Sequence, residues 1–238
     1  MKDLKEYIRE SIEDNTDETL KNSITKWIKS NTKSIKEYRL DFDFNTTPVT
    51  VNYDGDIMFK SNITSLTNDI FQWGEVKGFF NCVNCPSLTS LEGAPKVVWD
   101  EFGCDYCDSL KSLKGSPEKV RGDFYCSYCK SLESLEGAPK EVGGSFYCIS
   151  CVSLKSLKGA PQYVEVDFKC RNCESLNSLN GAPKEVGMDF NCSECTSLTS
   201  LKGAPNKVGN DFYCGNCGVQ FTGNDIEKVS KVSGEINC

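Results

Sequence analysis

Histidine is absent from all 238 residues of the chain. Histidine is the usual general base near neutral pH and the commonest metal ligand, so its absence removes every Ser–His or Cys–His nucleophile arrangement. Carboxylate or lysine chemistry would remain, but no residue stands out as catalytic. We therefore expect a protein that is not an enzyme and that carries no cofactor.

Long apolar runs are also missing. No stretch of about 18 apolar residues occurs, so no membrane-spanning helix is expected. The N-terminal Met-Lys-Asp-Leu-Lys-Glu-Tyr lacks the apolar segment of a secretory signal. The net charge of -7 and the pI near 4.9 argue against nucleic-acid binding, which needs a basic stripe. These features predict a protein of a reducing cytosol that contacts neither membrane nor nucleic acid.

Phenylalanine and paired cysteines recur every 22 residues. The seven phenylalanines are Phe80, Phe102, Phe124, Phe146, Phe168, Phe190 and Phe212. Each is followed by a Cys-x-x-Cys pair: Cys82/Cys85, Cys104/Cys107, Cys126/Cys129, Cys148/Cys151, Cys170/Cys173, Cys192/Cys195 and Cys214/Cys217. Self-similarity at a fixed period of this length is the mark of a solenoid.

The rest of the unit supplies a second apolar segment and a corner. Six of the seven units continue as Ser-Leu-x-Ser-Leu-x-Gly-Ala/Ser-Pro, as in Ser131 to Pro139, and a valine such as Val142 follows three residues later. In Phe-x-Cys both named side chains point to one face of a strand, and Gly-Ala-Pro turns the chain. One coil buries too little to be stable alone, so the sequence predicts a stack of seven coils over 80–217, joined by a parallel strand ladder.

Phe-x-Cys-x-x-Cys-x-Ser-Leu resembles the leucine-rich-repeat segment Leu-x-Leu-x-x-(Asn or Cys)-x-Leu, with the second cysteine in the Asn/Cys position. More narrowly, the whole unit, which ends Gly-Ala-Pro-Lys-Glu-Val-Gly, resembles repeat proteins encoded by bacteriophages and prophages. The resemblance covers about residues 58–217. It implies a β-rich, leucine-rich-repeat-like solenoid and a place of action in the cytoplasm of a bacterial host.

The two ends lack the repeat. Residues 1–30 predict two short amphipathic helices, with Asn15 and Glu18 able to cap the second. Residues 31–79 predict a β cap: Tyr38 to Phe44 and Val49 to Tyr53 alternate as strands, Asp54-Gly55 marks a turn, and Ile63-Thr64-Ser65-Leu66 resembles a decayed repeat. Residues 218–238 are expected to form the C-terminal cap.

The first ten residues carry a second resemblance. Met1, Lys2, Leu4, Glu6, Tyr7, Ile8 and Glu10 resemble the capsid-targeting segment of head-internal proteins of large tailed phages, and Ile8-Arg9-Glu10 resembles the sequence cut by their maturation proteases. This resemblance implies packaging into the virion. A plain amphipathic helix accounts for the same residues.

The cysteines admit three interpretations. A reduced ladder in the core needs no partner, because free cysteine behaves as a small, buried hydrophobe. Neighbouring Cys-x-x-Cys pairs also have the spacing of four-thiolate zinc sites, although seven pairs divide awkwardly into such sites. Disulfides between coils are geometrically possible but disfavoured in a reducing compartment. We expect the reduced ladder and no metal.

Positions that vary between coils and face outward are free to bind a partner. The residues that flank the first cysteine of each pair form such columns, and they predict a protein-binding cluster. Its members are Tyr106, Tyr125, Tyr128, Tyr147, Ile149, Lys169, Arg171 and Tyr213. Aromatic residues also suit strands for reasons of propensity alone. The acidic column before phenylalanine, which includes Asp123 and Asp167, is expected to be a solvated edge.

Three functions follow. The first is a protein–protein interaction scaffold of phage or prophage origin that binds, and in a narrower version inhibits, a bacterial host defence protein. The second is a polythiol protein that uses the cysteine ladder for metal binding or redox chemistry. The third is a structural component of the virion. The thiols should be accessible in the second case and buried in the first.

Overall fold

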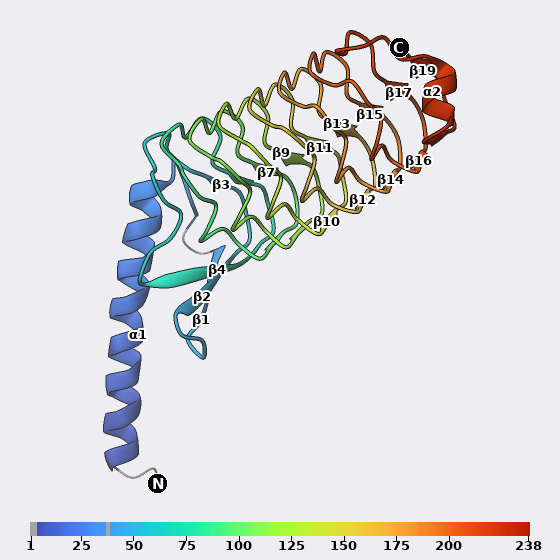
Figure 1. The fold of residues 1–238 in the computed structure, drawn as a ribbon. Helices are drawn as coiled ribbons and strands as arrows, with labels where there is room; N and C mark the ends of the chain where they lie inside the picture. Colours follow the sequence, from blue (N-terminus) through green and yellow to red (C-terminus); the bar gives the residue numbers. More distant parts are fainter. Residues whose placement is uncertain (1–3, 37–38) are drawn as a thin grey trace.

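The computed structural model describes residues 4–36 and 39–238, with side chains from residue 16 onward. Successive coils stack along one axis into a β-solenoid, with α1 (Leu4–Asn31) at one end and α2 (Gly223–Glu227) at the other (Figure 1). Within these residues no helix combines the length and the hydrophobicity needed to cross a membrane.

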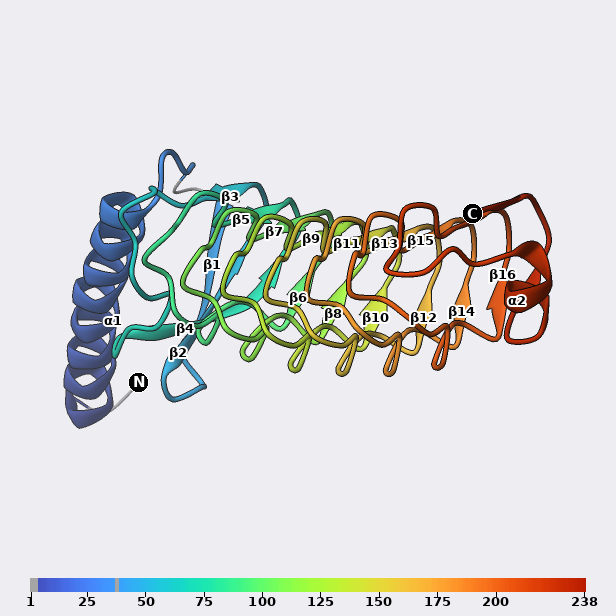
Figure 2. The same cartoon turned by 45° about the horizontal axis from the view of Figure 1, so that its top comes forward.

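One long side of the solenoid is a ten-stranded sheet, named here the valine sheet. Its strands, in spatial order, are β1 (Leu40–Asp43), β2 (Val49–Tyr53), β4 (Phe71–Val76), β6 (Val97–Val98), β8 (Lys119–Val120), β10 (Glu141–Val142), β12 (Tyr163–Val164), β14 (Glu185–Val186), β16 (Lys207–Val208) and β18 (Lys231–Val232). β1 and β2 pair antiparallel, and the other neighbours pair parallel. Figure 2 shows the strands side by side between the two helices.

The adjoining side is a nine-stranded parallel sheet, named here the phenylalanine sheet. Its strands are β3 (Ile57–Met58), β5 (Phe80–Asn81), β7 (Phe102–Gly103), β9 (Phe124–Tyr125), β11 (Phe146–Tyr147), β13 (Phe168–Lys169), β15 (Phe190–Asn191), β17 (Phe212–Tyr213) and β19 (Ile236–Asn237). Phenylalanine pairs with phenylalanine from coil to coil, as in Phe124 with Phe146. The predicted solenoid with a parallel ladder at a 22-residue period is therefore confirmed.

The stack is longer than the seven coils that the phenylalanine period predicts. Ile57 pairs with Phe80 at the N-terminal end, and Ile236 pairs with Phe212 at the other. A β-branched aliphatic side chain suits the pleated ladder as phenylalanine does, so both rungs continue the sheet without the residue that marks the period. The two segments predicted as caps thus contribute complete rungs to both sheets.

The core lies between the two sheets and the return segment of each coil. The coil that begins at Phe124 buries six apolar side chains: Phe124, Cys126, Cys129, Leu132, Leu135 and Val142. The phenylalanine rings of successive coils stack, with centroids 5.0 Å apart between Phe124 and Phe146. No coil can exclude water from both of its faces by itself, so the core exists only in the stack.

Glycine at the corner permits the close approach of successive coils. Gly137 has a φ of 91°, a region that side-chain-bearing residues rarely adopt. A Cβ on this residue would lie 2.5 Å from the backbone of Lys114 in the preceding coil. The Gly-Ala-Pro corner is thus required by backbone conformation and by space together.

The N-terminal end differs from expectation in one respect. A single helix, α1, spans Leu4–Asn31, where two short helices were predicted. Residues 13–19 contain neither glycine nor proline, so nothing forces a break, and the capping signal at Asn15 is overridden. Ile24 and Ile28 are buried, and Trp27 packs edge-on against Phe71.

The segment after α1 follows the prediction within the described residues. β1 and β2 form the expected alternating strands, and Tyr38 lies outside the described residues. Ile63 and Leu66 of the decayed repeat are buried, and Gly93 of the next coil lies against Leu66. The side chains of the capsid-targeting motif lie outside the described residues.

Candidate protein-binding surface

Two columns of tyrosine lie on coils two to four, at and beside the phenylalanine sheet. Tyr125 and Tyr147 stack with ring centroids 5.0 Å apart, and Tyr106 and Tyr128 stack at 4.6 Å with parallel rings. The first pair is half-buried on the outer face of β9 and β11. The second pair is 48% and 38% exposed, a large aromatic area in contact with water. These four residues and Ile149 are named here the tyrosine surface.

The outer pair projects because its backbone is left-handed. Tyr106 and Tyr128 have φ values of 58° and 59°. Every complete coil repeats this conformation immediately before its second cysteine, at Asn84, Tyr106, Tyr128, Ser150, Asn172, Glu194 and Asn216. The turn brings the second cysteine into the core while the residue before it points outward. Tyrosine is unusual in this conformation, because side chains other than Asn and Asp seldom adopt it.

Hydrogen bonding divides the predicted tyrosines into two groups. The Tyr125 hydroxyl donates to Asp123 Oδ2 at 2.7 Å, and the Tyr213 hydroxyl donates to Asp211 Oδ2 at 2.8 Å. Burial, together with that hydrogen bond, raises the pKa of Tyr125. The hydroxyls of Tyr106, Tyr128 and Tyr147 have no hydrogen-bond partner among the described residues. Those three are therefore free to donate to a bound protein.

The two predicted cations border the tyrosine surface. Lys169 Nζ lies 2.8 Å from Asp167 Oδ2 and 5.8 Å from the centroid of the Tyr147 ring. Arg171 lies 3.7 Å from Glu194 and is exposed. Seven of the eight predicted residues thus fall on coils two to five. Tyr213 does not join them, because it lies on coil seven, three coils beyond Tyr147.

From Asp123 onward the acidic column is a hydrogen-bonded ladder of half-buried carboxylates, so the predicted solvated edge is wrong for these aspartates and holds for the exposed Glu101 at the start of the column. Each of the aspartates accepts the backbone N–H of the residue that follows it in the column one coil later. The bonds run from Ser145 N to Asp123 (2.6 Å), Asp189 N to Asp167 (3.0 Å), Asp211 N to Asp189 (3.2 Å) and Glu235 N to Asp211 (2.7 Å). The sequence shows the acidic residues, but it does not show which backbone amides of the next coil donate to their carboxylates.

Asp105 repeats this arrangement beside the tyrosine surface. Its Oδ1 accepts the N–H of Ser127 at 2.5 Å. Burial raises the pKa of Asp105 to about 6, because the charged carboxylate loses contact with water. A half-buried carboxyl therefore lies directly before Tyr106 in the chain.

The cysteines form two continuous columns in the core. Thirteen of the fifteen are buried, whereas Cys217 is half-buried and Cys238 is exposed. From the second coil to the seventh, the second cysteine donates its S–H to the backbone carbonyl of the first cysteine one coil earlier. These contacts are 3.1–3.3 Å long, as for Cys129 to Cys104, Cys151 to Cys126, Cys173 to Cys148 and Cys217 to Cys192.

The thiol–carbonyl contact explains why cysteine recurs at the second position. No backbone amide among the described residues donates to the carbonyls of Cys104 or Cys126, and a buried carbonyl without a donor is unfavourable. Burial raises the pKa of second-position thiols such as Cys151 and Cys173, which keeps them protonated as donors. Within the described residues no group of three or more Cys, Asp or Glu is placed to hold a metal ion.

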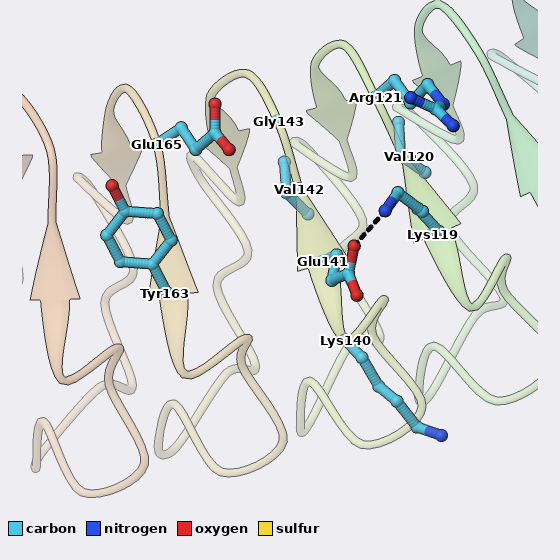
Figure 3. A pocket seen from close by; sticks show the side chains of 9 residues that line it. All are labelled: Lys119, Val120, Arg121, Lys140, Glu141, Val142, Gly143, Tyr163 and Glu165. Carbon is cyan, nitrogen blue, oxygen red and sulfur yellow. Dashed lines mark hydrogen bonds and ion pairs between the residues drawn. The ribbon is translucent and has the colours of Figure 1, made fainter.

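A concave feature lies on the valine sheet. A groove of about 430 Å³ crosses the outer side of β8, β10 and β12 (Figure 3). Gly143 leaves the gap, because the neighbouring coils carry Arg121 and Glu165 in the same column. Lys119 and Glu141 form an ion pair along one wall. The charges that line the groove are mixed in sign, so they favour neither an anion nor a cation.

Exposed aromatic side chains flank this groove, and the sequence interpretation missed them. Trp99 is 42% exposed, the guanidinium of Arg121 lies 3.9 Å from its ring centroid, and Tyr163 is 50% exposed. Trp99, Arg121 and Tyr163 each flank the recurring valine of their coil, and the variation of those columns from coil to coil is the sequence signal for them.

Comparison of the chain with protein-family models, with curated proteins and with solved structures gave no match. The side chains arranged on the solenoid are therefore the basis on which a function can be proposed. The tyrosine surface is the feature that combines stacked aromatic rings, unpaired hydroxyls and adjoining cations.

Proposed function

We propose that the chain is a non-enzymatic scaffold that binds a protein partner through the tyrosine surface. Two stacked tyrosine pairs present a rigid aromatic area, because each ring is held by its neighbour one coil away. Tyrosine and arginine are the residues that most often dominate the energy of protein interfaces. The single observation that carries the proposal is the exposure of Tyr106 and Tyr128 as a parallel pair at 4.6 Å.

The backbone conformation supports the same proposal. Asn occupies the left-handed position in three coils and is well suited to it, whereas tyrosine at this position has no such advantage. The two tyrosines add nothing to the core of the solenoid, since both are exposed. Unfavourable residues held at exposed positions are most simply explained by a contact with another molecule.

The partner is a protein of the bacterial host, as the resemblance to phage and prophage repeat proteins implies. Lys169 and Arg171 are each paired with a carboxylate of the chain, so the surface offers little uncompensated charge. We therefore propose a partner that presents apolar and hydrogen-bond-accepting groups to the tyrosine hydroxyls. Inhibition of a defence protein is the narrower form of this function.

Burial of the thiols favours the scaffold over a polythiol protein. Working thiols need access to solvent, and thirteen of the fifteen cysteines lack it. Their S–H groups also have structural partners, the carbonyls of the preceding coil. Packaging into the virion is compatible with protein binding, and mass spectrometry of purified particles tests it separately.

Affinity capture with matched variants tests the proposal. The full chain is immobilised and exposed to bacterial lysate, captured proteins are identified by mass spectrometry, and the purified candidate is titrated against each variant. Tyr106→Ala with Tyr128→Ala should weaken binding by about 30-fold or more, the effect of losing about 2 kcal/mol at an interface hot spot. Tyr163→Ala, similarly exposed but on the valine sheet, is the control and should leave the affinity unchanged.

Unchanged affinity in the double variant would refute the assignment of the surface. Loss of affinity in Tyr163→Ala alone would move the binding site to the groove on the valine sheet. Both variants change exposed side chains only, so a correctly folded protein is expected in each case.

A further inference from the structure

Three thiols meet in one open cavity at the C-terminal end of the solenoid. Cys214, Cys217 and Cys238 line a cavity of about 380 Å³, together with Phe221 and other residues. Elsewhere in the stack the cysteines are buried, so this is the place where solvent reaches the sulfur columns. Neither the protein-binding surface nor the structural ladder accounts for that access.

Two of these sulfur atoms are in direct contact. Cys214 Sγ and Cys238 Sγ are 3.0 Å apart. The contact follows from register, because β17 and β19 pair with Phe212 opposite Ile236 and Tyr213 opposite Asn237. Cys238 is therefore the next member of the column of first cysteines. Neighbouring parallel strands lie about 4.8 Å apart, within the Cα separations that a disulfide spans.

Accessibility distinguishes this pair from the others in the column. Cys126 and Cys148, for example, also occupy neighbouring coils, but both are fully buried. Cys238 is exposed, and Cys214 lies directly beneath it with 1% of its surface exposed. A soluble oxidant can reach one thiol of this pair, and the second thiol is in place to complete the reaction.

We propose that Cys214 and Cys238 are a redox site that forms a disulfide by exchange with a low-molecular-weight disulfide. The Cys238 thiolate attacks one sulfur of the reagent, which gives a mixed disulfide and releases one small thiolate. The Cys214 thiolate then attacks Cys238 Sγ, and the second small thiolate leaves. The two protein thiols are oxidised, the reagent is reduced to two thiols, and the two protons remain with solvent or with the released thiolates.

The product would fix the last coil to the stack. The bond joins the residues that directly follow β17 and β19 and closes a loop over residues 215–237, which contains α2, β18 and β19. Opening of that coil would then require the loop to unfold as a closed ring. Burial raises the pKa of Cys214, which agrees with Cys238 as the first nucleophile.

Cys217 provides a matched control in the same cavity. Its Sγ donates to the carbonyl of Cys192 at 3.3 Å, toward the preceding coil and away from Cys238. The spacing Cys214-x-x-Cys217 would also suit a redox pair, so this alternative must be separated by experiment. Cys217→Ser removes it without touching the contact between Cys214 and Cys238.

The experiment equilibrates the reduced full chain with oxidised and reduced glutathione at several ratios, then traps free thiols with an alkylating reagent. Peptide mapping without reductant should identify a bond between Cys214 and Cys238 in the wild type and in Cys217→Ser, and none in Cys238→Ser. Oxidation should slow tryptic cleavage at Lys228 and Lys231 by about tenfold or more, since the closed loop resists local opening. Cys238→Ser should show no such protection.

Three results would overturn the proposal. These are a bond between Cys214 and Cys217 in place of the proposed one, glutathione held on Cys238 without transfer to Cys214, and no oxidation at any ratio in a chain whose circular dichroism is native. Cys238 is exposed, so its replacement by serine leaves the folded core intact and keeps the comparison valid.

Discussion

The second cysteine of each coil should act as a hydrogen-bond donor as well as a small apolar side chain, and Cys129 allows a direct test. It is fully buried, and its thiol donates to the carbonyl of Cys104 at 3.1 Å. Cys129→Ala leaves that carbonyl without a donor, which costs about 1–3 kcal/mol. The lost burial of one sulfur adds roughly 1 kcal/mol, by analogy with a buried methylene. Cys129→Ser keeps a donor in place and should lose roughly 1 kcal/mol.

Cys148 is the matched control, because it is equally buried and no hydrogen bond of its thiol is present in the described structure. A serine hydroxyl there would be buried without an acceptor, so Cys148→Ser should be less stable than Cys148→Ala. The order of serine and alanine is therefore reversed between the two positions. Urea unfolding under reducing conditions, followed by far-ultraviolet circular dichroism, measures all four variants. If serine is the worse substitution at Cys129 as well, the thiol–carbonyl ladder contributes nothing.

Two further predictions concern the Gly-Ala-Pro corner and the half-buried carboxyl of Asp105. Gly137→Ala should lower the free energy of unfolding by more than about 1 kcal/mol, because the φ of Gly137 is 91° and the backbone of Lys114 occupies the space of a Cβ. Gly223 has open space around it, so Gly223→Ala should be neutral, and equal urea midpoints for the two variants would contradict this prediction. Asp105→Asn should equal the wild type below about pH 4 and become relatively more stable as the pH rises through 6. The raised pKa of Asp105 means that the protonated carboxyl stabilises the fold, and this contribution is lost once it ionises, by about 3 kcal/mol at most. A pH-independent difference between the two proteins would exclude that account.

The fold could be predicted because one period sets both register and direction. Phe124 and Cys126 alternate with Tyr125, so the inward and outward faces follow as soon as the strand is assigned. The rungs at the two ends escaped prediction because Ile57 and Ile236 satisfy the same apolar position without the identity that marks the repeat. A count of recurring phenylalanines therefore underestimates the number of rungs, because a rung requires only an apolar side chain at that position.

The candidate surface could be predicted in part. The outward columns placed Tyr125 and Tyr147 together, and the structure adds the parallel stack of Tyr106 and Tyr128. The tyrosines themselves do not predict the left-handed backbone of Tyr106 and Tyr128, because tyrosine seldom adopts it. Asn84 and the other asparagines at the same position of the repeat do indicate that conformation.

The role of the acidic column was missed for a different reason. Whether a carboxylate is solvated or bonded to an amide of the next coil depends on the positions of atoms 22 residues apart. Residues 22 positions apart in the sequence are neighbours in space here, and only the stacked structure shows their contact. The S–H contacts of the second cysteines were hidden in the same way.

Thiol titration of the native chain tests the placement of the sulfur columns most directly. The reduced protein is treated with an alkylating reagent, first folded and then in denaturant, and the labelled cysteines are identified by peptide mapping. Only Cys217 and Cys238 should react rapidly in the folded state, and all fifteen cysteines should react after unfolding. Rapid native labelling of interior cysteines such as Cys126 or Cys148 would contradict the inward-facing ladder and, with it, the outward orientation of the tyrosine surface.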